Sequence, residues 1–414
     1  MPPSHGILYP SLVVLAARLG ALIIQPEHRF FGASQPLAPA PFSTSHLQLL
    51  TPQQALADAA ALIEATRVAR NCTGRNGQPR CPAITAGGSY PGWQAFAMRL
   101  RYPAVVDMAY SASPALGFYN QVVDPLGYYA RVTASAARAS AGCPAAVRAL
   151  LAATLAAADK PTMVQKLNLC APLPAYIEAG DAALLRDELA MVFQYSWANM
   201  NMANYPPPPF SRTRLLEACE AIEGAPPGDP WGALAGFFGN FSGGGGACFN
   251  LSAQMPSGPN ATISSGDWSG VGSGDDGSSW DYETCLYCVQ PIGTNGVSDM
   301  FLPRAFSYDW QTQHCQSRFN MTPQPRVLPG LWGTDEDALP RVTSRIVFTN
   351  GLNDGWSVGG VMRNLSDSLL SFSMVNGAHH SDLNYAWPSV NDTHDVLETR
   401  ELVAQTLERW LAEL

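Results

Sequence analysis

The stretch Gly87-Gly88-Ser89-Tyr90-Pro91-Gly92 constrains the fold of this chain most strongly. It places a serine between an apolar run, Ala83 to Ala86, and a helix-like segment, Trp93 to Tyr102. A sharp turn from strand to helix lifts a serine hydroxyl out of a sheet, and the helix N-terminus beneath it offers N–H groups to an oxyanion. Taken alone, the same residues also fit an ordinary glycine-rich turn. The stretch indicates a nucleophile elbow only together with an acid and a histidine.

An acid and a histidine follow two further apolar runs near the end of the chain. Ser344 to Asn350 is typical of a buried strand and leads into a turn that carries Asp354. Leu369 to Val375 leads in the same way into His379 and His380. The order Ser, Asp, His, with the last two after strands, is that of α/β-hydrolases. In that chemistry the serine attacks, a histidine moves its proton and the aspartate orients the histidine. The residues alone do not decide whether His379 or His380 is the base.

Motifs spread along the whole chain support this interpretation. They are Glu27 to Gly32, Leu50 to Asp58, the elbow around Ser89, Trp280 to Cys285, Thr294 to Phe301, Asn350 to Trp356 and Gly377 to Leu383. In these motifs and their order the chain resembles the lysosomal Pro-X carboxypeptidase and post-proline dipeptidyl peptidase family of serine peptidases. The resemblance implies an α/β-hydrolase, with a doubly wound sheet and an inserted helical cap domain. It also implies peptide substrates with proline at P1, an acyl-enzyme, and a secreted or lysosomal/vacuolar setting.

The resemblance assigns roles to individual residues. It implies that Ser89, Asp354 and His379 form the catalytic triad, since the first histidine of the Gly-Ala-His-His motif is the base in that family. The backbone N–H of Tyr90 is the expected oxyanion donor. Trp356, two residues after the acid, is expected to form one wall of an apolar S1 pocket that binds proline. A core tryptophan beneath the turn is the alternative for Trp356.

Strand and helix signals set the expected domain bounds. Strands are predicted at Ala21–Glu27, Ala104–Ala109 and Arg345–Thr349, and Thr51-Pro52-Gln53-Gln54 is a capping signal that opens a helix. Helical periodicity takes over from about Gly117 onward.

The helix-like region is the predicted cap. It includes Ala137–Ala156 and Ala182–Tyr195. We therefore predict hydrolase residues 1–116 and 333–414, interrupted by a cap over residues 117–332.

Composition fits a globular enzyme. The chain of 414 residues is 47% hydrophobic and carries a net charge of −9, with a pI of about 5.2. This charge argues against nucleic-acid binding and supplies no polybasic membrane patch. The longest early apolar run, Leu12 to Ile24, is broken by Arg18 and Gly20. We interpret it as a helix followed by a strand, and predict neither a signal peptide in this chain nor a membrane span.

Sequons and cysteines indicate a secreted or lumenal protein. Seven asparagines head N-x-S/T triplets and are predicted glycosylation sites: Asn71, Asn240, Asn250, Asn260, Asn320, Asn364 and Asn391. Nine cysteines without metal-ligand spacing predict disulfides and one free thiol, and we predict no metal and no cofactor. The resemblance implies the pairs Cys143–Cys219, Cys170–Cys248 and Cys285–Cys315. Cys72 and Cys81 bracket a polar loop that a disulfide would close, which leaves Cys288 unpaired.

The chain departs from the family in three places, and these departures limit which family properties can be expected of it. The chain begins after the point where the family has a signal peptide and a glycine-rich oxyanion segment, so we expect an incomplete N-terminus. Gly355 stands in place of the usual proline after the acid, and Pro91 in place of a glycine in the elbow. A family cysteine pair is also missing, near Pro125 and at Gly293.

The missing N-terminal segment keeps open a catalytically weak or inactive glycoprotein that acts as a binding module. An esterase with the same triad, which differs only in its substrate, is a further alternative. The sequence separates neither carboxypeptidase from dipeptidyl peptidase nor a monomer from a homodimer.

Overall fold

A parallel sheet organises this computed structural model, which describes residues 8–37, 44–77, 79–205, 212–242, 247–251, 275–332, 335–384, 390 and 392–414. The strands of the sheet are β1 (Ile84–Gly88), β2 (Met108–Ala112), β3 (Ile346–Gly351) and β4 (Leu369–Met374). They lie in the order β1-β2-β3-β4, and every neighbouring pair is parallel. All carboxyl ends therefore meet at one edge, where loops from different strands can share a site.

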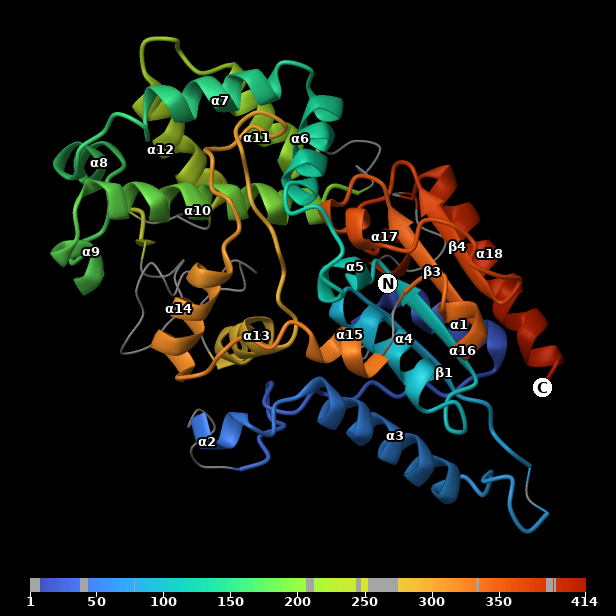
Figure 1. The fold of residues 1–414 in the computed structure, drawn as a ribbon. Coiled ribbons are helices and arrows are strands. Elements are labelled where there is room, and N and C mark those ends of the chain that lie inside the picture. The colour runs from blue at the N-terminus through green and yellow to red at the C-terminus, as the bar shows by residue number, and fades with distance from the viewer. Residues whose placement is uncertain are drawn as a thin grey trace.

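Helices cover both faces of this sheet (Figure 1). On one face α4 (Tyr90–Arg101) packs on β1 and β2. On the other face α1 (Pro10–Leu19) and α18 (His394–Ala412) cover alternate strand residues, among them Tyr110 and Val347. Parallel strands buried between two helical layers form the α/β architecture that the sequence predicted.

Between β2 and β3 the described chain folds into helices. They are α5 (Leu116–Tyr119), α6 (Gly127–Ala139), α7 (Cys143–Ala153), α8 (Lys160–Lys166), α9 (Ala175–Ala179), α10 (Ala182–Met202), α11 (Arg214–Glu223), α12 (Pro230–Phe241), α13 (Asp275–Leu286), α14 (Tyr308–Phe319), α15 (Val327–Trp332) and α16 (Leu339–Val342). Figure 1 shows α6 to α12 as one group beside the sheet. The last residue of helix α10 contacts the loop that follows β4: the Met202 carbonyl accepts a hydrogen bond of 3.2 Å from the His379 N–H.

The remaining helices include the one predicted from the capping signal. Helix α3 (Pro52–Ala69) begins after Thr51, whose hydroxyl accepts a hydrogen bond of 3.2 Å from the Gln54 N–H. Proline at the first helical position has no N–H to leave unpaired. Short helices α2 (Thr44–Leu47) and α17 (Ser381–Asn384) complete the set described here.

The strand predicted at Ala21–Glu27 is wrong. These residues form no strand, and the side chains of Leu22 and Ile24 are 59% and 42% exposed. Strand propensity measures how well a residue fits a half-buried pleated surface, so apolar residues without a layer to pack on do not form a strand.

Two further predicted elements have different bounds. The strand predicted at Ala104–Ala109 begins only at Met108, because the N–H groups of Val105 and Val106 both bond back to the Tyr102 carbonyl in a turn. The helix predicted at Ala137–Ala156 is interrupted, since α6 ends at Ala139 and α7 begins at Cys143.

Four disulfides join the cysteine pairs that were named from the sequence. They are Cys72–Cys81, Cys143–Cys219, Cys170–Cys248 and Cys285–Cys315. The second joins α7 to α11 and the fourth joins α13 to α14, so they cross-link the helical region. Cys288 is a buried free thiol.

Candidate active site

Ser89 occupies a strained turn between β1 and α4. Its φ of 63° and ψ of −128° lie where an L-residue other than glycine is rarely found. The turn is tight: a Cβ on Gly87 would lie 2.6 Å from the Pro91 carbonyl carbon, and one on Gly92 would lie 2.5 Å from the Ala112 oxygen. Both glycines are required by this close crossing of strand and helix, and Pro91 fits within the first helical turn. The local geometry is that of a nucleophile elbow.

Asp354 and His379 form a hydrogen-bonded pair at the ends of β3 and β4. Asp354 Oδ2 lies 2.6 Å from His379 Nδ1, and Asp354 Oδ1 accepts a hydrogen bond of 3.0 Å from the Trp356 N–H. Asp354 is fully buried and His379 is 6% exposed. Because the carboxylate faces Nδ1, that nitrogen carries the proton and Nε2 is left with a lone pair. This tautomer suits a general base.

The two histidines have different surroundings. His380 packs on the elbow, since a Cβ on Gly88 would lie 2.6 Å from His380 Cγ. Its backbone N–H donates a 2.9 Å hydrogen bond to Ser113 Oγ, and burial, together with the adjacent His379, holds the pKa of His380 well below its usual range. The ring centroids of the two histidines are 4.5 Å apart. The acid contacts His379, so geometry favours that residue as the base.

Ser89 and His379 are not hydrogen-bonded within the described chain. The packing of His380 on Gly88 places the histidine loop beside the elbow. Hydrogen bonds between nucleophile and base are often long before substrate binds, so the absence of this bond among the described residues is compatible with catalysis.

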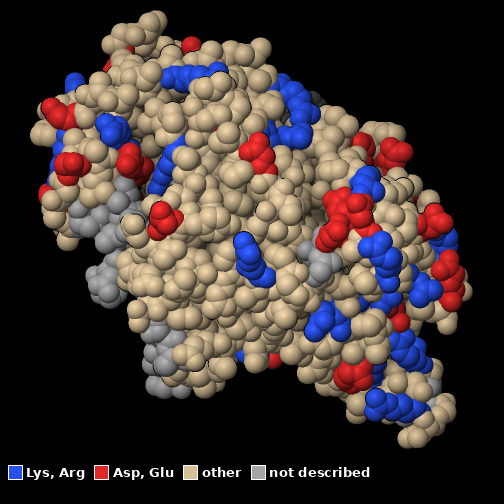
Figure 2. Space-filling view, viewed as in Figure 1, with Lys and Arg blue, Asp and Glu red and all other residues tan. Residues whose placement is uncertain are grey.

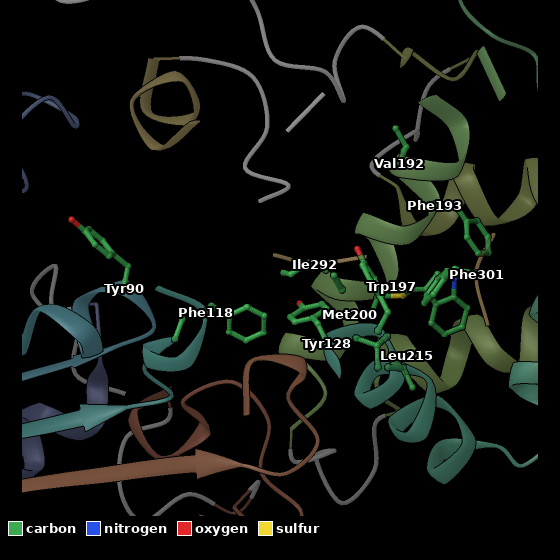
Figure 3. Close-up of a cluster of buried hydrophobic side chains, with 14 of the residues drawn as sticks. Tyr90, Phe118, Tyr128, Val192, Phe193, Trp197, Met200, Leu215, Ile292 and Phe301 are labelled. Atoms are coloured by element: carbon green, nitrogen blue, oxygen red, sulfur yellow. The ribbon is translucent and has the colours of Figure 1, made fainter. Parts of the chain in front are cut away.

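Tyr90 is the first residue of α4. Its backbone N–H lies in the first turn, where no intrahelical acceptor exists and the helix dipole is positive. Its hydroxyl is used elsewhere: it donates a 2.9 Å hydrogen bond to Glu283 Oε1. Figure 3 shows this hydroxyl pointing away from Phe118. Glu283 thus holds the side chain of Tyr90, while the backbone N–H has no intrahelical acceptor.

Trp356 lies between the acid and an aromatic cluster. It belongs to the 3-10 helix η3 (Gly355–Gly359), and its ring meets Phe118 and Tyr128 edge-on, with centroids 5.0 and 4.9 Å apart. Its centroid is 6.4 Å from that of His379. Figure 3 shows Phe118 and Tyr128 within an apolar cluster that includes residues of α10 such as Trp197 and Met200. Trp356 itself is partly buried.

Sequence reasoning missed the α10 residue that holds the acid turn. Asn201 of α10 accepts a 2.9 Å hydrogen bond from the Gly355 N–H and donates one of 2.6 Å to the Asn353 carbonyl. Proline at position 355 could not donate this bond, which accounts for the departure noted there. No local signal identifies Asn201, because its partners are about 150 residues away in the chain. Glu283 did lie in a noted motif, but without an assigned role.

Side chains that could bind a metal do not gather in the described chain, where no group of three or more His, Cys, Asp or Glu is suitably placed. Among the same residues, no helix combines the length and apolar character needed to cross a membrane. Acidic and basic side chains are interspersed on the face in Figure 2, whose centre is mostly uncharged.

The sequon asparagines are at the surface wherever the structure describes them. These are Asn71, Asn240, Asn250, Asn320 and Asn364, all exposed. The other two, Asn260 and Asn391, lie outside the described residues. Exposure is necessary for glycan attachment, so the five positions are compatible with it.

A parallel sheet between helical layers, with a serine elbow and an Asp–His pair at the strand ends, defines an α/β-hydrolase. Comparison with known families makes this specific. The chain belongs to the serine carboxypeptidase S28 family, which it matches over residues 3–403. It is therefore a serine peptidase of the exopeptidase type by family.

Individual relatives align over nearly the whole chain. It is 29% identical to the lysosomal Pro-X carboxypeptidases of Mus musculus and Homo sapiens, over 96% of this chain and 77% and 76% of those proteins. It is 26% identical to the thymus-specific serine protease of Mus musculus, over 97% of this chain and 76% of that protein.

Proposed function

We propose that this chain hydrolyses peptide bonds after proline, with Ser89, His379 and Asp354 as its catalytic triad. The observation that carries the proposal is the 2.6 Å contact between Asp354 Oδ2 and His379 Nδ1, at the sheet edge where Ser89 occupies its strained turn. The proposed proline specificity is supported by two relatives, from Mus musculus and Homo sapiens, that are named lysosomal Pro-X carboxypeptidase.

The proposed reaction passes through an acyl-enzyme. His379 Nε2 takes the proton from Ser89 Oγ as this oxygen attacks the proline carbonyl carbon, and then gives it to the leaving amine. Water, deprotonated by His379, attacks the ester and releases Ser89. Asp354 holds the ring and stabilises the imidazolium. The Tyr90 N–H, at the start of α4, stabilises the oxyanion.

Proline selectivity is assigned to the aromatic surface beside the base. Trp356, supported by Phe118 and Tyr128, offers apolar contact without a charged floor. The proline ring is compact and apolar, so an aromatic wall binds it well.

Matched peptides test the specificity. Pro-Phe and Ala-Phe bonds are compared at acidic and neutral pH, with the N-terminus or the C-terminus blocked in turn. Cleavage of Pro-Phe alone is expected, and Trp356→Ala should reduce the preference. Loss of cleavage on blocking the C-terminus identifies a carboxypeptidase, and loss on blocking the N-terminus a dipeptidyl peptidase. Equal rates on both bonds would favour the esterase, and inactivity on every peptide and ester the binding module.

The proposed compartment is the secretory or lysosomal/vacuolar lumen. Four disulfides and five exposed sequon asparagines support it, since disulfides persist in oxidising compartments. Peptide mapping without reduction, before and after glycosidase treatment, tests the proposal. Recovery of every cysteine as a free thiol from active protein would contradict it.

A further inference from the structure

Three segments that the triad does not use converge behind the nucleophile elbow. They contribute His28 from the Glu27–Gly32 motif, Tyr90 from α4, and Glu283 from α13 in the Trp280–Cys285 motif. Tyr90 directly follows Ser89, so whatever holds its side chain also holds the proposed oxyanion donor.

Glu283 is a buried carboxylate with incomplete hydrogen bonding. It is fully buried, its Oε1 accepts the 2.9 Å hydrogen bond from the Tyr90 hydroxyl, and its Oε2 has no hydrogen-bond partner in the described chain. Burial raises the pKa of Glu283, and burial likewise holds the Tyr90 hydroxyl pKa far above its usual range. The Tyr90 hydroxyl therefore keeps its proton and always donates. A single neutral donor is little compensation for a buried carboxylate.

His28 turns a buried ring nitrogen, Nε2, toward Glu283. Its Nδ1 lies 2.8 Å from the Arg29 carbonyl oxygen, which only accepts, so Nδ1 must carry a hydrogen. A neutral His28 then turns the Nε2 lone pair toward Glu283 Oε1, 3.8 Å away. Two acceptors would face each other unless one of them holds a proton. The His28–Glu283 pair is therefore complete with one additional proton, on Nε2 or on the carboxyl group.

We propose that Glu283 is a positioning residue for the nucleophile elbow, acting through the Tyr90 hydroxyl, and that the contact depends on the proton shared by Glu283 and His28. This inference rests on the proposed function, because its effect is on Ser89 acylation. The other titratable groups that face Glu283 in the described chain are Tyr119, Tyr282, Tyr287 and Cys288, none of which can be a cation.

Loss of the shared proton has a defined consequence. It leaves the Glu283 carboxylate as an uncompensated buried charge between α13 and α4. The packing around Tyr90 must then loosen so that water can reach this charge. Displacement of the Tyr90 N–H weakens oxyanion stabilisation, which lowers the rate of acylation more than substrate binding. The elbow is thus better ordered at acidic pH than at alkaline pH.

The test measures acylation by a fluorophosphonate probe and peptide kcat and KM across pH. Glu283→Gln still accepts from Tyr90 and needs no proton, so its activity should persist to a pH about one unit higher than that of the wild type. Glu283→Leu removes the acceptor and should lower kcat by about 10- to 100-fold with little change in KM. His28→Gln, with Glu283 retained, should lose activity at a lower pH than the wild type. Circular dichroism and the melting temperature establish that each variant is folded.

A matched control uses the neighbouring ion pair. Asp58 pairs with Arg29, next to His28, and its side chain is 55% exposed, so Asp58→Asn should keep the wild-type profile. Wild-type pH profiles and kcat in folded Glu283→Gln and Glu283→Leu would overturn the positioning role while leaving the proposed function intact. Absence of acylation in the wild type itself would overturn both.

Discussion

The Asn201 side chain of helix α10 brackets Asp354, accepting from the Gly355 N–H at 2.9 Å and donating to the Asn353 carbonyl at 2.6 Å. The turn that carries the acid is therefore fixed by α10 as well as by β3.

We predict that Asn201→Ala lowers kcat/KM about tenfold or more, because the acid turn loses both contacts. It should also destabilise the fold by about 1–3 kcal/mol, since the buried Gly355 N–H loses its acceptor. Peptide kinetics and thermal unfolding measure the two effects. Asn199→Ala, at an exposed position on the same helix, is the control. Equal kinetics in the two variants would show that Asn201 does not position Asp354.

Asp382, three residues after His379, is the second structural support of the site. Its Oδ2 accepts hydrogen bonds from the Tyr110 hydroxyl at 2.5 Å and Thr349 Oγ1 at 2.6 Å, and its carbonyl accepts one from Arg400 Nε at 2.6 Å.

Asp382→Ala should therefore reduce the free energy of unfolding by about 2–4 kcal/mol, because it leaves the buried hydroxyls of Tyr110 and Thr349 without their acceptor. Urea denaturation measures the loss, and Asp367→Asn, at an exposed position, should cause almost none. A loss below about 1 kcal/mol would mean that the network contributes little.

Glu188 in α10 makes stability depend on pH. Burial raises its pKa from 4.5 to about 8, and neither carboxyl oxygen has a hydrogen-bond partner in the described chain. Between these two values the folded protein binds more protons than the unfolded chain, so the free energy of unfolding falls as pH rises.

Glu188→Gln should flatten that decline, which we expect to reach ~5 kcal/mol. Urea denaturation at several pH values measures the slope. Glu178→Gln, whose side chain is 56% exposed in the wild type, should retain the wild-type slope. The same slope in both variants would contradict the assignment.

The Cys143–Cys219 disulfide links α7 to α11 across a separation of 76 residues. Replacing both cysteines with alanine should cost about 2–4 kcal/mol, largely because the unfolded chain is less constrained. Thermal unfolding of the double variant measures this cost. Cys288→Ala breaks no bridge and serves as the comparison. An unchanged melting temperature in the double variant would contradict the prediction.

Local sequence patterns predicted an element correctly where its geometry depends only on neighbouring residues. The Ser89 turn, the capping of α3 at Thr51 and the apolar run of β3 each depend on a few consecutive residues. The segment Ala21–Glu27 failed because strand formation depends on a neighbour that its own composition does not specify.

The contacts that support the site could be identified only from the tertiary structure. Asn201 and Gly355 are 154 positions apart, and Tyr90 and Glu283 are 193 apart. Only the folded chain brings these residues together, so the positions of Asp354 and Tyr90 could be named from motifs while the groups that hold them could not.

Mapping the residue acylated by a fluorophosphonate is the sharpest test of the proposed triad. We predict a single adduct on Ser89, its loss in Ser89→Ala, and near-complete loss in His379→Ala, because the serine hydroxyl is a poor nucleophile without its base. Loss of acylation in His380→Ala, with His379→Ala still reactive, would reverse the assignment of the base. An adduct on another residue, or labelling that survives Ser89→Ala, would contradict the proposed triad.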